Sequence, residues 1–134
     1  MATGTDNTTV ARESHEQQVH YLRKSVTYSD DGTAVTVGVL PAGATILKPL
    51  SGVNVDTAFD AGTTNTLNIG TSGDDNLYGT LLAVGSIAFV PLDEAVAMTV
   101  SAVTTITATV VLTGTAATAG AGEVIIAYIP DGDG

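Results

Sequence analysis

The sequence predicts an all-β fold in which antiparallel strands pack as a sandwich, a barrel or a jelly roll. Threonine, glycine, alanine and valine dominate the chain, whereas leucine, glutamate and lysine, which favour helices, are scarce. Short segments with an apolar residue at every second position recur about every ten residues, separated by glycine, proline, aspartate and asparagine. No segment has a convincing helical period, so the residues alone leave these three β architectures open.

The length of 134 residues corresponds to one domain, which we expect over residues 19–130. Residues 1–18 are polar and lack a sustained period, which predicts an extended N-terminal arm that is mobile or held by another chain. Residues 131–134 form an acidic tail. A domain of this size can bury a real core without disulfides, and the chain contains no cysteine.

In the first half of the chain, the strand expected over residues 19–28 carries charges on both faces, as is typical of an edge strand or one lying against a partner. A turn is expected at residues 29–32, and turn residues also follow the next strand. Extended segments are expected in four further places, namely residues 35–39, 45–50, 53–59 and 67–69.

In the second half, residues 77–84 fit either a strand or a single helical turn. The strand at 104–113 has one aliphatic face and one threonine face, which predicts a sheet with one side in water. Residues 124–129 are apolar on both faces and predict a central strand. Two further strands are expected at residues 86–90 and 96–102.

The net charge of −10 is unevenly distributed, because all four basic residues (Arg12, Arg23, Lys24 and Lys48) precede residue 49. An acidic surface repels phosphate groups, so we expect no nucleic acid and no anionic membrane as partner. We also expect no secretory signal and no membrane span, because residues 1–18 lack an apolar core and no apolar run is long enough. The absence of cysteine suits synthesis in a reducing cytoplasm.

No group of side chains predicts catalysis, so we expect no enzyme activity and no cofactor. His15 and His20 lack a third metal ligand nearby and a plausible serine partner. Asp93 and Glu94 are adjacent in an expected loop, where solvation is more plausible than acid–base chemistry. The glycines at 114, 120 and 122 have no following lysine or helix, so they form no phosphate loop.

A weak candidate metal site lies at Asp74, Asp75 and Asn76, with Asp60 as a further candidate ligand. The segment GTSGDDNLYG (residues 70–79) is like one copy of the glycine–aspartate nonapeptide of calcium-binding β-rolls, but that fold needs stacked copies. A turn whose side chains bond the local backbone is the simpler interpretation. We therefore expect no metal in the fold.

The expected contact surface is the strand at residues 19–28, because large side chains occupy both of its faces. Arg23, Lys24 and Lys48 could form a basic docking patch, or they could simply keep the domain soluble. The residues predicted to contact another subunit or a larger assembly are Tyr21, Leu22, Arg23, Lys24, Val26, Tyr28 and Lys48.

Three consecutive segments resemble one known family. They are VTYSDDGTAVTVGVLPAGATI, VNVDTAF and AGTTNTLNIGTS, with a fainter likeness through the final VIIAYIP. In this order they resemble the head-decoration (capsid cement) proteins of tailed bacteriophages, particularly short-tailed ones. The resemblance implies a jelly-roll β-sandwich that sits as a homotrimer on the outer capsid, binds the major capsid protein and clamps neighbouring shell subunits. It implies no catalytic residues.

Two alternative functions remain open. A trimeric receptor-binding or fibre-tip module would also be β-rich and viral, although the chain shows no heptad or collagen-like repeat. A small carbohydrate-binding domain would normally expose tryptophan or tyrosine for stacking on sugars. The chain has no tryptophan, and Tyr21 and Tyr28 fall in one expected strand.

Overall fold

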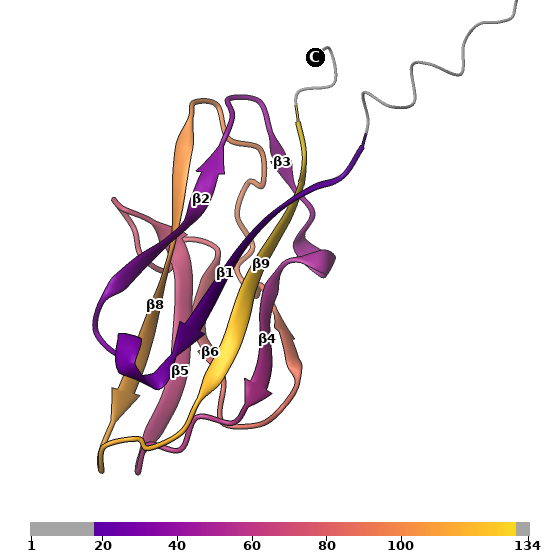
Figure 1. Cartoon of the computed structure of the whole chain (residues 1–134). Coiled ribbons are helices and arrows are strands. Elements are labelled where there is room, and N and C mark those ends of the chain that lie inside the picture. The colour runs from indigo at the N-terminus through magenta and orange to yellow at the C-terminus, as the bar shows by residue number, and fades with distance from the viewer. Residues whose placement is uncertain (1–17, 131–134) are drawn as a thin grey trace, which may run out of the picture.

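Two antiparallel sheets packed face to face form the protein, as the computed structural model of residues 18–130 shows (Figure 1). The predicted tail at 131–134 and the predicted arm, Gln18 excepted, lie outside these residues. The strands of the described part are β1 (His20–Thr27), β2 (Ala34–Leu40), β3 (Thr45–Ile46), β4 (Gly52–Thr57), β5 (Thr64–Thr71), β6 (Gly79–Ala83), β7 (Phe89–Pro91), β8 (Thr104–Thr113) and β9 (Ala121–Ile129). Short 3₁₀ turns lie at Tyr28–Asp30 and Lys48–Leu50.

The strand order is that of a jelly roll. One sheet runs β1-β9-β4-β7, with β3 also paired to β9, and the other runs β2-β8-β5-β6. With β3 set aside, the first strand pairs with the last, the second with the next to last, and so inward to β5 with β6. A long hairpin rolled into two sheets gives this nested pairing. The predicted antiparallel, jelly-roll-like sandwich is therefore confirmed.

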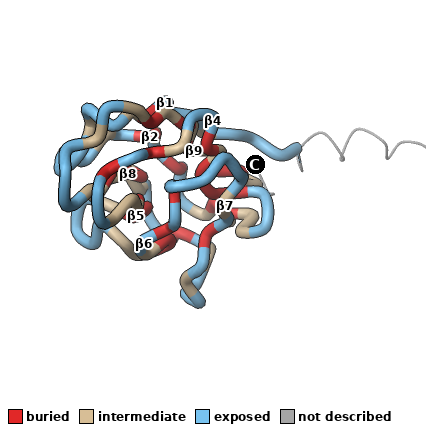
Figure 2. Tube along the Cα trace, turned by 90° about the horizontal axis from the view of Figure 1, so that it is seen from below, coloured by how far each residue is buried: buried red, intermediate tan, exposed pale blue. Residues whose placement is uncertain are grey.

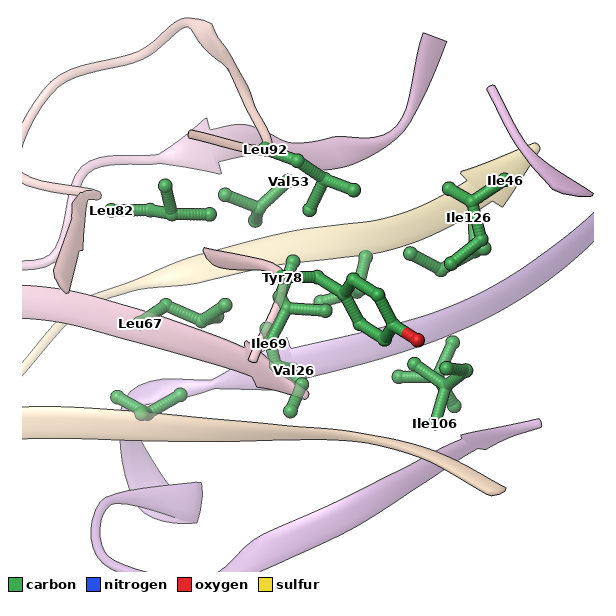
Figure 3. Close-up of a cluster of buried hydrophobic side chains, with 14 of the residues drawn as sticks. Val26, Ile46, Val53, Leu67, Ile69, Tyr78, Leu82, Leu92, Ile106 and Ile126 are labelled. Atoms are coloured by element: carbon green, nitrogen blue, oxygen red, sulfur yellow. The ribbon is translucent and has the colours of Figure 1, made fainter. Parts of the chain in front are cut away.

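Aliphatic side chains from the inner faces of both sheets form the core (Figures 2 and 3). Leu67, Ile69 and Ile106 of the four-stranded sheet meet Val53 and Ile126 of the five-stranded one, and all five are fully buried. Leu67, Ile69, Ile106 and Val53 belong to alternating segments, which is why their strands have one apolar face, whereas Ile126 belongs to the run that is apolar on both faces. Since no tryptophan is present, many small aliphatic contacts supply the burial.

One end of the core is closed by Phe59, which is buried beneath the loop before β9. Gly120 of that loop has a φ of 148°, and a Cβ on it would lie 2.6 Å from the Phe59 ring. Only glycine therefore allows the loop to pass this close to the ring.

The strand predicted at residues 96–102 is wrong. This segment makes a single bridge, between Thr99 and Thr45, and is otherwise irregular. Its neighbour β3 is only two residues long, and a 3₁₀ turn at Lys48–Leu50, which contains Pro49, follows where a longer extended segment was expected. Residues 96–102 consequently have only this short strand beside them, and no longer ladder of paired residues forms. Of residues 77–84, ambiguous in sequence, Gly79–Ala83 form β6.

The threonine face of β8 is less exposed than predicted. Ile106, Ala108 and Val110 face the core as expected. On the opposite face, however, Thr107 is only 7% exposed, and the hydroxyl oxygens of Thr107 and Thr109 are shielded from solvent. The alternation is thus correct, but the two hydroxyls in the middle of this face are shielded from water.

A buried charge on β8 should unfold the domain. Val110→Asp places a carboxylate between the sheets at a cost of several kcal/mol, against about 5–15 kcal/mol of total stability for a typical domain. Thr113→Asp, at the exposed end of the same strand, should remain folded. Circular dichroism melts of the two variants check this, and equal losses would contradict the assignment of faces.

Candidate functional site

Strand β1 lies at the edge of the five-stranded sheet and pairs only with β9, which confirms the predicted edge position. Because side chains alternate along β1, the predicted contact residues are divided between its two faces. Tyr21 is 57% exposed, whereas Leu22 packs partly against the core. Val26 is 1% exposed, so its inclusion among the contact residues was wrong: its side chain fills the space between the sheets. Tyr28 begins the 3₁₀ turn after the strand and is exposed.

Arg23 is held by a neighbouring strand. Its Nε and Nη2 donate to the two carboxylate oxygens of Glu123 on β9, at 3.1 and 2.8 Å. The hydrogen bond and charge of Glu123 raise the pKa of Arg23 above its ordinary value. An acidic partner would therefore have to compete with Glu123 for this guanidinium.

The other two candidate bases do not join Arg23 in one patch. Lys24 is exposed on β1. Lys48 lies in the turn before β4, and its Nζ donates to the backbone carbonyl of Glu94 at 2.8 Å. Glu94 follows β7, which is at the opposite edge of the sheet from β1. Arg23 and Lys24 are consecutive residues of β1, so their side chains point to opposite faces of the sheet, and the three bases do not form one patch.

A shallow, mainly apolar hollow lies on the outer side of β1. Tyr21 and Arg23 form its walls together with Ile125, which is paired with Arg23 across the sheet, and its volume is about 240 Å³. This space would accept one large side chain of a neighbouring molecule. Ile125 could not be predicted as part of this hollow, because local alternation does not show which distant strands pair with each other.

The acidic side chains are mostly engaged with the backbone. Several aspartates at loops accept hydrogen bonds from main-chain N–H groups, which secures turns where no regular ladder exists. These acceptors are Asp30 for Thr27, Asp31 for Leu112, Asp60 for Thr118 and Ala119, Asp74 for Asn76, and Asp93 for Thr80.

The weak metal candidates belong to such a turn. The backbone carbonyl of Asp74 accepts a hydrogen bond from the N–H of Thr71, and its side chain accepts one from Asn76. A Cβ at Gly70 would lie 2.1 Å from that carbonyl oxygen, so glycine lets the turn fold back onto β5. Within residues 18–130, no group of three or more His, Cys, Asp or Glu side chains could hold a metal ion.

The remaining residues considered for metal binding or acid–base chemistry do not form a cluster in the described part of the chain. His20 lies on β1 with its ring 5.6 Å from that of Tyr128, and His15 is outside the described residues. Asp93 and Glu94 occupy a loop, as predicted. In the described part of the chain, no helix is long and apolar enough to cross a membrane.

Calcium should leave the stability of the domain unchanged, because Asp74 already bonds the local backbone. Thermal melts with EDTA and with millimolar calcium should agree. A calcium-dependent rise in Tm of more than about 5 °C, on the order of 1 kcal/mol for a domain of this size, would show that residues 74–76 do bind the ion.

Acid should release the loop held by Asp60. Hydrogen bonds from the backbone of Thr118 and then Ala119 lower the pKa of Asp60 below its ordinary value of 3.8. The carboxylate therefore stabilises the fold above that value, and its contribution is lost as pH falls through the lower folded-state pKa. Asp60→Ala should lower Tm at pH 7, and melts should show the difference from wild type shrinking as the pH falls below 3.8. A constant difference across this range would contradict a charge-dependent bond.

Comparison with known proteins gives one fold-level relation. No family model matches the chain, and no curated protein matches it. A solved structure described as "Cyanophage Pam1 capsid asymmetric unit" contains a chain similar in fold, with a TM-score of 0.63 and 22% identity. The match covers 85% of this chain and 86% of that one. At this identity the likeness shows a shared β-sandwich fold.

Proposed function

We propose that this protein is a structural component of a phage virion that decorates and stabilises the outer surface of the capsid. It binds the major capsid protein as a homotrimer and clamps neighbouring shell subunits. The observation that carries the proposal is the fold shared, over most of both chains, with a chain from a cyanophage capsid asymmetric unit. The resemblance of residues 26–79 to head-decoration proteins points to the same role.

The distribution of charge and chemistry supports an external structural role. A chain with a net charge of −10 is poorly suited to lie against packaged DNA inside a shell. Its loop aspartates are engaged in holding turns, as described above. A small domain of this kind gains function most readily through assembly, and three linked copies would raise its avidity for a three-fold site on the shell.

The contact surface in this proposal is the β1 edge. From the predicted set, Tyr21, Leu22, Arg23, Lys24 and Tyr28 belong to this edge as contacts with a neighbouring subunit or with the shell. Lys48 lies apart from it and is retained as a separate candidate contact. Tyr21 is the principal candidate, because exposed aromatic residues beside a hollow often dominate binding energy. Tyr21 and Tyr28 lie towards opposite ends of β1, which does not favour a sugar-stacking platform.

Co-sedimentation with undecorated capsids tests the proposal. The wild-type chain should pellet with particles and have three times the 13.4 kDa chain mass by light scattering. Tyr21→Ala should weaken particle binding at least about tenfold, or about 1.4 kcal/mol. The control Val103→Ala removes an exposed apolar side chain outside β1 and should bind normally.

Two results would contradict this picture. A wild-type chain that stays in the supernatant at micromolar concentration would defeat the decoration role. Normal binding by Tyr21→Ala would remove β1 from the contact surface while leaving decoration intact.

A further inference from the structure

The two sheets differ sharply in charge. Strands β2, β5, β6 and β8 contain no charged residue, whereas the other sheet carries His20, Arg23, Lys24, Asp56 and Glu123. Because the chain has 14 acidic residues, a whole sheet without a charged residue is unusual. Its outer side is called the threonine face here, and its principal residues are Thr36, Val39, Thr66, Leu81, Thr107 and Thr109.

The threonine face is less polar than its composition suggests. The hydroxyl oxygens of Thr107 and Thr109 are buried and have no hydrogen-bond partner. The hydroxyl of Thr66 donates to the carbonyl of Val111 at 3.0 Å. The partly exposed surface of Thr109 is consequently carbon. Contact with water alone would favour outward hydroxyls, so this arrangement suits an apolar partner.

Large apolar side chains flank the same face. Val39 on the edge strand β2 is 50% exposed, and Leu81 on the opposite edge strand β6 is 55% exposed. Leu81 also has a φ of 50°, a left-handed conformation that leucine rarely adopts, and its N–H is held by the side chain of Asn68. The backbone thus fixes an unfavourable conformation that leaves a leucine in solvent.

We propose that the threonine face of one copy binds the β1 edge of a second copy. This inference rests on the proposed trimer. A closed ring of three requires two different patches on each subunit, because every contact joins one patch to the other. The β1 edge, with Tyr21 and its hollow, supplies one patch. The threonine face supplies the other.

Charge around the two patches is complementary. Strand β1 contains Arg23 and Lys24 and no acidic residue. The threonine face is bordered by Asp31 beside β8 and by Asp93 beside the edge strand β6. Because Glu123 already binds Arg23, the attraction at the rim depends mainly on Lys24, while the uncharged centre avoids the repulsion that acidic copies would otherwise experience.

The threonine face is large enough to form a specific interface between two copies. Four strands about 4.8 Å apart and roughly 7 residues long make a surface of about 19 by 24 Å. Covering it on both partners removes on the order of 1,000 Å² from solvent, which is at the lower limit for a specific interface. Val39 and Leu81, on the two edge strands, contribute apolar surface to this area.

Light scattering on matched variants tests the inference. Thr36→Asp places a charge on the face at an exposed position of an edge strand, and Thr57→Asp adds the same charge at an exposed position of the other sheet. Both should melt as folded domains. Thr57→Asp should stay trimeric, whereas Thr36→Asp should require at least about tenfold more protein to assemble. Thr109→Val should assemble as wild type, because it removes only a hydroxyl without a partner.

The outcomes separate this inference from the proposed function. Unchanged assembly of Thr36→Asp, or loss of assembly in Thr109→Val, would overturn the contact. A Thr36→Asp trimer that no longer pellets with capsids would mean that the face binds the shell, which also overturns it but leaves decoration standing. A monomeric wild type would defeat the trimer itself.

Discussion

Strand β9 is the element on which the larger sheet depends, because it is hydrogen-bonded along both edges. It pairs with β1 on one side and with β4 and β3 on the other, and its Val124 and Ile126 are fully buried. The buried hydroxyl of Ser51 adds a further tie by bonding both the carbonyl and the N–H of Ala127. Without β9, β1 and β3 would have no partner in the sheet, and the edge that carries the candidate contact residues would not exist.

Local alternation predicts most of this fold, because a strand with one face in the core must repeat every second residue. The apolar run at 124–129 was correctly assigned to the centre of a sheet, and the mixed faces of β1 to an edge. Prediction failed where pairing decides the structure. Residues 96–102 alternate well, yet they lie beside β3, a strand of two residues that is soon followed by the 3₁₀ turn containing Pro49. Period alone shows which side a residue could face and not whether a partner strand is present.

The same limit applies to the candidate site. Tyr21 and Arg23 were predicted as contacts because their strand carries large side chains on both faces. The burial of Val26 and the positions of Ile125 and Glu123 beside them depend on pairing with β9. The acidic residues show the converse. For Asp30 and Asp74 the local sequence context correctly indicated turns, since each bonds an N–H only a few residues away. Asp31, Asp60 and Asp93 instead bond distant segments, which local context does not show. Chemistry that is local in sequence can be predicted, and surfaces assembled from distant strands cannot.

The nested pairing of strands has a consequence for how the chain is made. A ribosome releases β1 first, yet its partner β9 is the last strand to emerge, since His20 pairs with Tyr128. Likewise β2 must wait for β8. Only the central hairpin of β5 and β6 can form early, so folding is expected to be slow and to proceed outward from that hairpin. During this interval the nascent chain exposes uncharged, β-prone strands, and repulsion between the acidic residues of the intervening loops is expected to oppose aggregation.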